Sequence, residues 1–217
     1  MSFNDRAGCG PRVKICGVAD PNSLKALIKL RIDAVGFIFF DGSPRAVVGS
    51  QVQSWVEDMP PFVSTVGVFV DEKITQVKKM VDLCGLGRVQ LHGQEPPEYC
   101  AKLPRSRVIK AFRVKEGFTS DMVKPYVPYV SAVMIDSVSA GETFDWSVAR
   151  RIRDENPDLP VIVAGGISMD NVEEIVEQVD PYAIDVSSGV ESSPGVKDPA
   201  KVEELLRRIR PSVSNRP

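Results

Sequence analysis

The feature that most constrains the fold is a regular alternation of short apolar segments with amphipathic stretches along the 217-residue chain. Each apolar segment has the length of one buried strand, and each is followed by a stretch with helical periodicity. The predicted strands are Arg12–Cys16, Ala34–Phe39, Val63–Val70, Arg88–Leu91, Val108–Phe112, Ala132–Ile135, Val161–Ala164 and Ala183–Val186. Strands that alternate with helices predict a parallel sheet, and eight is the number that closes a barrel with a filled interior.

The intervening stretches carry the apolar spacing of helices that pack on one face. An early example begins at Leu24, Leu27 and Ile28, and two later stretches show the full i, i+3, i+4, i+7 pattern. These two are Val172, Ile175, Val176 and Val179, and Val202, Leu205, Leu206 and Ile209. The spacing therefore predicts helices between the strands.

Capping residues predict where several helices begin and end. Asp20 and Asp198 each precede a proline, which suits an N-cap followed by the first helical turn. Ser50 with Gln53 is typical of a capping box. Gly85, followed closely by Gly87, suits the exit of a helix before the fourth strand.

These patterns favour one domain, a single (β/α)8 or TIM barrel spanning residues 12–210. The competing fold is a doubly wound sheet, but no GxGxxG motif follows the first strand. Residues 1–11 and 211–217 fall outside the pattern, and we expect them to be flexible ends. In such a barrel the active site lies at the carboxyl ends of the strands.

Composition limits the partners that the chain can have. Net charge is −2 and no basic block stands out, so we expect no nucleic-acid partner. We find no signal peptide and no apolar run of about 20 residues, which predicts a cytoplasmic protein without a membrane partner. The chain has one histidine, His92, and its four cysteines form no CxxC pair, so we expect no metal site. No pattern indicates an oligomeric state.

Polar side chains at the strand ends are the candidates for a reaction site. Alternation along each strand, with apolar residues facing the helices, directs the others into the barrel. The inward polar residues are Lys14, Cys16, Gln90, His92, Asp136 and Asp185. Lys14 and Asp185 lie on strands that become neighbours when the barrel closes, so we expect them to pair, because a lone buried charge is too costly.

Two turns have the composition of a phosphate-binding site. Gly165 and Gly166 follow the seventh strand and lead, through Ser168 and Asn171, into a helix start. The eighth strand is followed by a second turn of small residues, Ser187, Ser188 and Gly189. The loops after strands seven and eight usually supply backbone N–H groups to phosphate in this fold.

Taken together, the motifs resemble the phosphoribosylanthranilate isomerase family of tryptophan biosynthesis from about residue 12 to 210. The matching segments are KICG (14–17), AVGFIFF (34–40), SPR (43–45), VGVFV (66–70), VQLHG (89–93), ID (135–136), FDW (144–146), AGGI (164–167), DVSSGVE (185–191) and PGVKD (194–198).

The resemblance implies an aldose–ketose isomerase that carries out an Amadori rearrangement of N-(5′-phosphoribosyl)anthranilate without a cofactor. Asp136 would be the acid for the ring oxygen and Cys16 the base for the C2′ proton. Arg45 would hold the anthranilate carboxylate, and His92, Lys14 and Asp185 are candidates for substrate contact. The phosphate would be held by Gly165, Gly166, Ser187, Ser188 and Gly189.

Physical chemistry adds three expectations. The charge of Lys14 should lower the pKa of the Cys16 thiol, and partial burial should raise the pKa of Asp136 so that it stays protonated. The family usually carries a longer glycine-rich loop after the acid, whereas residues 137–143 contain one glycine and Glu142. We therefore expect phosphate to be held mainly by amides near Gly166 and Ser188.

Three alternatives share the fold. A barrel similar to ribulose-phosphate epimerase would usually need a metal site, which a single histidine disfavours. A histidine-pathway isomerase uses two aspartates, whereas this chain has a cysteine on its first strand. A non-catalytic phospholigand-binding barrel would keep the phosphate turns without turnover, and only the short loop at 137–143 favours it.

Overall fold

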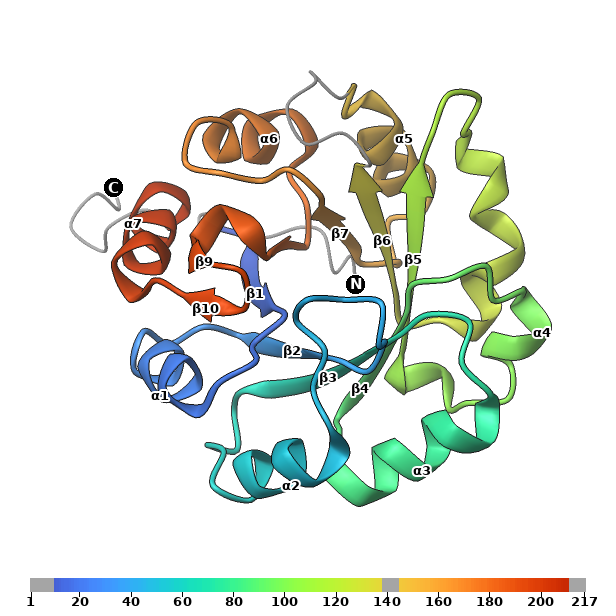
Figure 1. The fold of residues 1–217 in the computed structure, drawn as a ribbon. Helices are drawn as coiled ribbons and strands as arrows, with labels where there is room; N and C mark the ends of the chain where they lie inside the picture. The colour runs from blue at the N-terminus through green and yellow to red at the C-terminus, as the bar shows by residue number, and fades with distance from the viewer. Residues whose placement is uncertain (1–9, 138–144, 211–217) are drawn as a thin grey trace.

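The computed structural model describes residues 10–137 and 145–210, in which eight parallel strands close into a barrel (Figure 1). The predicted barrel is confirmed, with each strand paired to the next and β8 paired to β1. The strands are β1 (Arg12–Cys16), β2 (Ala34–Ile38), β3 (Ser64–Phe69), β4 (Arg88–Leu91), β5 (Val108–Val114), β6 (Ala132–Ser137), β7 (Val161–Ala164) and β8 (Ala183–Val186).

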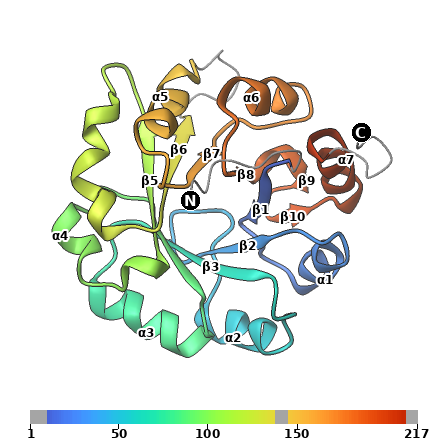
Figure 2. The same ribbon diagram turned by 180° about the vertical axis from the view of Figure 1, so that it is seen from behind.

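Helices form a ring around the barrel, as the views from either end show (Figures 1 and 2). They are α1 (Pro21–Lys29), α2 (Gly49–Glu57), α3 (Ile74–Cys84), α4 (Pro97–Cys100), α5 (Ser147–Glu155), α6 (Val172–Val179) and α7 (Pro199–Ile209). None of the helices in the described ranges is long and apolar enough to cross a membrane. A short hairpin of β9 (Glu191–Ser193) and β10 (Val196–Lys197) lies between β8 and α7.

Most of the predicted helix ends are confirmed. The Asp20 and Asp198 carboxylates accept hydrogen bonds from backbone N–H groups in the first turns of α1 and α7. Gly85 ends α3 with φ of 60°, a left-handed conformation that glycine adopts without strain. The capping box at Ser50 is wrong: α2 begins at Gly49 with Val48 as its N-cap, so Ser50 already lies inside the helix.

The connection between β5 and β6 departs from the expected strand–helix repeat. Two 3-10 segments, Ser120–Met122 and Lys124–Tyr129, take the place of an α-helix there. The second contains Pro125 and Pro128, and each proline lacks the N–H that an α-helical hydrogen bond requires. Most of the ends predicted to be flexible, and loop residues 138–143, lie outside the described ranges, so those predictions stay predictions.

Apolar side chains form two layers separated by the barrel wall. The outer layer joins the strands to the helices and includes Val13, Ile15, Val35, Phe37, Val163 and Ile184. The inner layer is smaller and consists of Val66, Ile109, Ala111, Ala132, Met134, Ile162, Ala164 and Ala183. Because strand residues alternate between the layers, the polar residues in the inner rows must point into the barrel.

The closing strands β1 and β8 place a buried ion pair in the barrel interior. Lys14 and Asp185 are direct register partners, as predicted. Lys14 Nζ lies 2.8 Å from Asp185 Oδ2, and each side chain is 5% exposed. Two charges in so dry a place are tolerated because each neutralises the other.

We expect Lys14→Met to lower the free energy of unfolding by roughly 3–5 kcal/mol, because it leaves the Asp185 charge buried without a partner. Urea unfolding measures this change. Lys124→Met is the matched control, since Lys124 pairs with Asp121 on the surface, and its stability should stay close to that of the wild type. Equal effects of the two substitutions would contradict the prediction.

Candidate active site

A cavity of about 230 Å³ opens at the carboxyl ends of the strands. Most of the predicted site residues line it, namely Cys16, His92, Asp136, Gly165, Gly166, Asp185, Ser187 and Ser188. Lys14, Arg45 and Gly189 are not part of this lining, and Lys14 lines a second cavity instead. Residues from strands distant in the sequence therefore meet at one small cavity.

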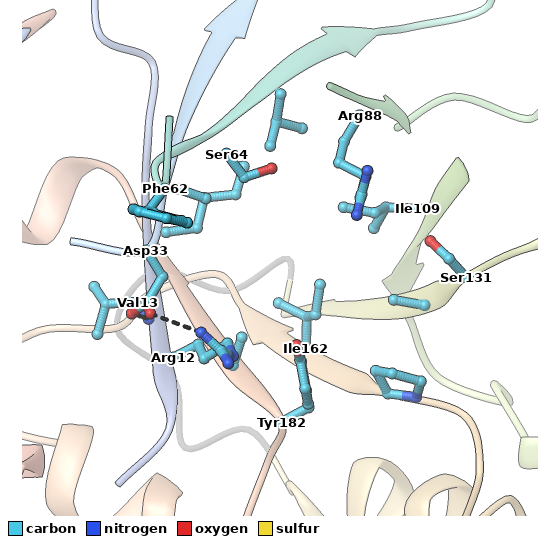
Figure 3. Close-up of a pocket in the computed structure, with 16 residues that line it drawn as sticks. Arg12, Val13, Asp33, Phe62, Ser64, Arg88, Ile109, Ser131, Ile162 and Tyr182 are labelled. Atoms are coloured by element: carbon cyan, nitrogen blue, oxygen red, sulfur yellow. Dashed lines mark hydrogen bonds and ion pairs between the residues drawn. The ribbon is translucent and has the colours of Figure 1, made fainter. Parts of the chain in front are cut away.

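A second cavity, of about 330 Å³, lies at the opposite end of the barrel (Figure 3). Its lining includes the first residues of β1, β3 and β4, which are Arg12, Ser64 and Arg88. Arg12 is already bound to Asp33 at 3.1 Å, and Phe62 at the rim is 95% exposed. The second cavity is larger and includes Lys14, but its lining has no cysteine, and its one carboxylate, Asp33, is paired with Arg12.

Cys16 lies beside the Lys14–Asp185 pair. Gly36 faces this cluster from β2, and a Cβ atom there would come within 2.8 Å of Cys16 Sγ and 3.0 Å of Lys14 Nζ. Glycine at position 36 therefore provides the space that the thiol and the ammonium group occupy. The alternation of side chains along the strand predicted that Lys14 and Cys16 point into the barrel. It did not indicate that Gly36 is needed to make room for them.

Lys14 lowers the pKa of the Cys16 thiol, as expected, but the net shift of that pKa is upward. Burial raises the pKa of the Cys16 thiol, and the charge of Asp185 raises it further. Lys14 and Lys197 act in the opposite direction, but they do not outweigh these two effects. The sequence argument counted the cation and left out the dry surroundings and the carboxylate beside it.

The imidazole of His92 joins Asp136 to Gln90. His92 Nε2 lies 2.8 Å from Asp136 Oδ2, and Gln90 Nε2 lies 2.9 Å from His92 Nδ1. With the Gln90 amide donating, Nδ1 accepts and the Nε2 proton is directed at the Asp136 carboxylate. Both ring nitrogens are thus occupied, so His92 holds Asp136 in place in this arrangement.

The turn that carries His92 is fixed by a buried ion pair that the sequence analysis did not identify. Lys110 Nζ lies 2.8 Å from Glu95 Oε2 and also donates to the carbonyl of Gly93. Glu95 in turn accepts from the N–H groups of Gly93 and Asp71. The pair therefore joins the loops after β3 and β4 beneath the site.

Arg45 reaches the site from the loop after β2. A Cβ atom at Gly17, whose φ is +72°, would come within 2.5 Å of Arg45 Cδ, so the absence of a side chain there admits the arginine stem. The Arg45 guanidinium makes two hydrogen bonds to Glu191, of 2.8 and 2.7 Å. Glu191 also accepts from Lys197 Nζ at 2.6 Å. The sequence analysis gave Glu191 and Lys197 no role.

The two predicted phosphate turns lie against each other. Gly165 and Gly166 both have left-handed backbones, with φ of 86° and 62°. The Asn171 side chain braces their turn by donating to the Gly166 carbonyl and accepting from the Ser168 N–H. A Cβ atom at Gly189 would lie 3.3 Å from Ser168 Cα and closer still to the preceding carbonyl. Gly189 thus permits the close approach of the two turns.

Ser187 connects the second turn to Cys16. Its hydroxyl donates to the Cys16 carbonyl at 3.0 Å, and its own carbonyl accepts from Lys197 Nζ at 3.2 Å. The Ser187 side chain is therefore engaged within the protein. We expect any contribution of this residue to an anion site to come from its backbone.

Arg113 also lines the cavity, and the sequence analysis missed it. The predicted fifth strand stops at Phe112, whereas β5 continues to Val114 and places Arg113 opposite Asp136. Ile109, Ala111 and Arg113 follow the inward row of the strand. Extending the alternation by two residues would have found it.

The fold and the cavity define a (β/α)8-barrel protein with a thiol and a carboxyl group at the catalytic end. A family model for N-(5′-phosphoribosyl)anthranilate isomerase matches residues 13–208. An isomerase of that name from Geobacter metallireducens is 45% identical over 205 residues, covering 92% of this chain and 98% of the relative. The chain belongs to the N-(5′-phosphoribosyl)anthranilate isomerase family.

Solved structures agree with this assignment. The phosphoribosylanthranilate isomerase of Thermus thermophilus has a TM-score of 0.81 and 34% identity, covering 91% of this chain and 97% of its own. Another isomerase was solved with reduced 1-(o-carboxyphenylamino)-1-deoxyribulose 5-phosphate. It has a TM-score of 0.80 and 33% identity, covering 92% of this chain and 98% of its own.

The charges around Cys16 predict opposite effects of two substitutions on its pKa. Asp185→Asn removes a charge that raises the pKa of the thiol, so the pKa should fall. Lys14→Met removes a cation that lowers it, so the pKa should rise. The pH dependence of Cys16 alkylation, read by peptide mass spectrometry, measures both. Shifts in the same direction would contradict the proposed balance of charges.

Proposed function

We propose that this chain converts N-(5′-phosphoribosyl)anthranilate to 1-(o-carboxyphenylamino)-1-deoxyribulose 5-phosphate, an Amadori rearrangement by general acid and base catalysis. The observation that carries the proposal is the placement of Cys16 and Asp136 on one cavity, in a chain of this family. Measuring turnover of the phosphoribosyl substrate by the purified protein tests it. Absence of turnover would favour the non-catalytic binding barrel.

Asp136 is the proposed acid. Its proton passes to the ring oxygen as the bond from that oxygen to C1′ breaks, and the nitrogen lone pair forms an iminium group with C1′. His92 supports this role, because its hydrogen bond fixes the orientation of the carboxyl group. An acid that is already held in the productive orientation loses less entropy on reaching the transition state.

Cys16 is the proposed base, acting as thiolate on the C2′ proton. Electrons of the C2′–H bond then form the C1′–C2′ double bond, and the C1′–N π electrons return to the nitrogen and cancel its positive charge. The resulting enolamine tautomerises to the ketone product by protonation at C1′ and loss of the 2′-hydroxyl proton. Because the free thiol has a raised pKa, we infer that the positive iminium group helps it to ionise. The rate should therefore rise with pH as the thiol loses its proton.

Substrate contacts follow from the charges around the cavity. Arg45 keeps the N–H groups of Nη1 for a carboxylate, since Nε and Nη2 bind Glu191. Asp185 lines the cavity, and its Oδ1 is buried without a protein partner among the described residues, so it suits a substrate hydroxyl. We assign the phosphate to backbone N–H groups of the turns at Gly165–Gly166 and Ser187–Gly189.

We also infer a cytoplasmic location. Cys16, Cys84 and Cys100 are buried free thiols, which is usual for proteins of a reducing compartment. Fractionation of the cells that make this protein tests the location.

Cys16→Ala should reduce kcat by on the order of 10²–10⁴, the usual range for loss of a general base. The fold should survive, because only one small side chain is removed. Steady-state kinetics measures the loss, and circular dichroism checks the fold. Cys84→Ala is the matched control, since Cys84 is a buried thiol far from the cavity lining. Near-normal kcat for Cys16→Ala would remove the base from the mechanism.

Asp136→Asn keeps the shape of the side chain but cannot deliver a proton. Turnover should collapse while affinity for a reduced product analogue stays within about tenfold, because the loss lies mainly in the transition state. Single-turnover kinetics and calorimetric titration separate the two quantities. If binding is lost and kcat is unchanged, Asp136 is a binding residue.

A further inference from the structure

Glu191 and the Pro194–Asp198 motif remain without a role in the reaction as described. Glu191 stands at the start of β9, and Lys197 stands opposite it in β10. The Lys197 side chain has no exposed surface and that of Glu191 is 6% exposed. Glu191 is a buried carboxylate that accepts two hydrogen bonds from Arg45, the arginine proposed to bind the substrate carboxylate. Its presence needs an explanation, because its negative charge by itself would repel that carboxylate.

The Arg45 side chain is held at both ends, and the hairpin holds its guanidinium end. Its stem lies over Gly17, and its head makes the two parallel hydrogen bonds to Glu191. This bidentate geometry fixes the plane of a guanidinium as well as its position. Glu191 is itself fixed, because its Oε1 also accepts from Lys197 Nζ and from the Gly195 N–H.

The charges in this group do not cancel. One carboxylate lies between two cations, so Arg45, Glu191 and Lys197 together carry a single positive charge. Burial alone would raise the pKa of Glu191, but hydrogen bonds from Arg45 and Lys197 outweigh burial and hold it at about 2. Burial lowers the pKa of Lys197, and Glu191 counteracts that shift. Lys197 thus offsets the Glu191 charge and leaves that of Arg45 for a ligand.

We propose that Glu191 is a positioning residue, which, neutralised by Lys197, holds the Arg45 guanidinium with its Nη1 edge toward the carboxylate of the substrate. The inference rests on the proposed function and deepens it, because it names what sets the preference for an anthranilate carboxylate. Lys197 links Glu191 to the turn beside Cys16, because its Nζ also donates to the Ser187 carbonyl.

Two readings of Glu191 make opposite predictions. If Glu191 acted only through its charge, Glu191→Gln would make the site more positive and strengthen the binding of a carboxylate. If it positions Arg45, the same substitution frees the guanidinium and weakens that binding. Glu191→Asp separates the readings again, because it keeps the charge and withdraws the carboxylate from Arg45.

The experiment compares two probes on the full-length protein. One is reduced 1-(o-carboxyphenylamino)-1-deoxyribulose 5-phosphate, and the other is the same molecule without its carboxyl group. The ratio of their dissociation constants is the carboxylate preference, and it does not depend on turnover. The variants are Glu191→Gln, Glu191→Asp, Arg45→Met and the double variant Glu191→Gln/Arg45→Met. Glu203→Gln, on the exposed face of α7, is the matched control.

We expect Glu191→Gln and Glu191→Asp each to reduce the carboxylate preference by about 10- to 100-fold, the scale for a hydrogen bond to a charged group. Affinity for the probe without the carboxyl group should change less than about threefold, which shows that the site still folds. Adding Glu191→Gln to Arg45→Met should cause no further loss, because the two residues act as one unit. In kinetics, KM should rise more than kcat falls.

Three results would overturn the inference. One is a carboxylate preference that rises or stays unchanged in Glu191→Gln, and another is additive losses in the double variant. The third is an equal loss of both probes in both Glu191 variants, which would make Glu191 a structural residue only. Failure of the proposed function is a separate result, namely no turnover of N-(5′-phosphoribosyl)anthranilate by the wild type.

Discussion

The site depends on the closure of the barrel, where β1 meets β8 and Lys14 meets Asp185. Residues 171 positions apart become neighbours there, and their ion pair lies inside the barrel beside Cys16. The pair has two effects on the thiol. Lys14 favours the thiolate, whereas Asp185 and burial favour the thiol and together outweigh Lys14. The raised pKa of the proposed base therefore depends in part on the same contact that closes the fold.

Side chains that we propose to act on the substrate are held in place by neighbouring residues. His92 and Gln90 hold Asp136, while Glu191 and Lys197 hold Arg45. Ser187 ties the turn after β8 to the Cys16 backbone. Such supports keep polar groups aimed at a small cavity, where a displacement of about 1 Å can cost a factor of 10² in rate.

Three glycines leave space at the site that a side chain would otherwise fill. Gly36 leaves space for the thiol and the lysine ammonium group, Gly17 for the arginine stem, and Gly189 for the contact between the two proposed phosphate turns. A glycine in a motif is easily taken as a turn residue, yet only Gly17 among these three has a left-handed backbone. For the other two, the close approach of neighbouring atoms requires the missing side chain.

The sequence by itself determined the barrel, the inward rows and the pairing of Lys14 with Asp185. These follow from two periodicities and from the high cost of an unpaired buried charge, which are properties of short segments and single residues. Tertiary structure decided the rest. The length of β5, which brings Arg113 to the cavity, depends on pairing with β6, and the raised pKa of Cys16 depends on all its neighbours together. The hold of Glu191 on Arg45 joins residues 146 positions apart, a distance over which no local pattern carries information.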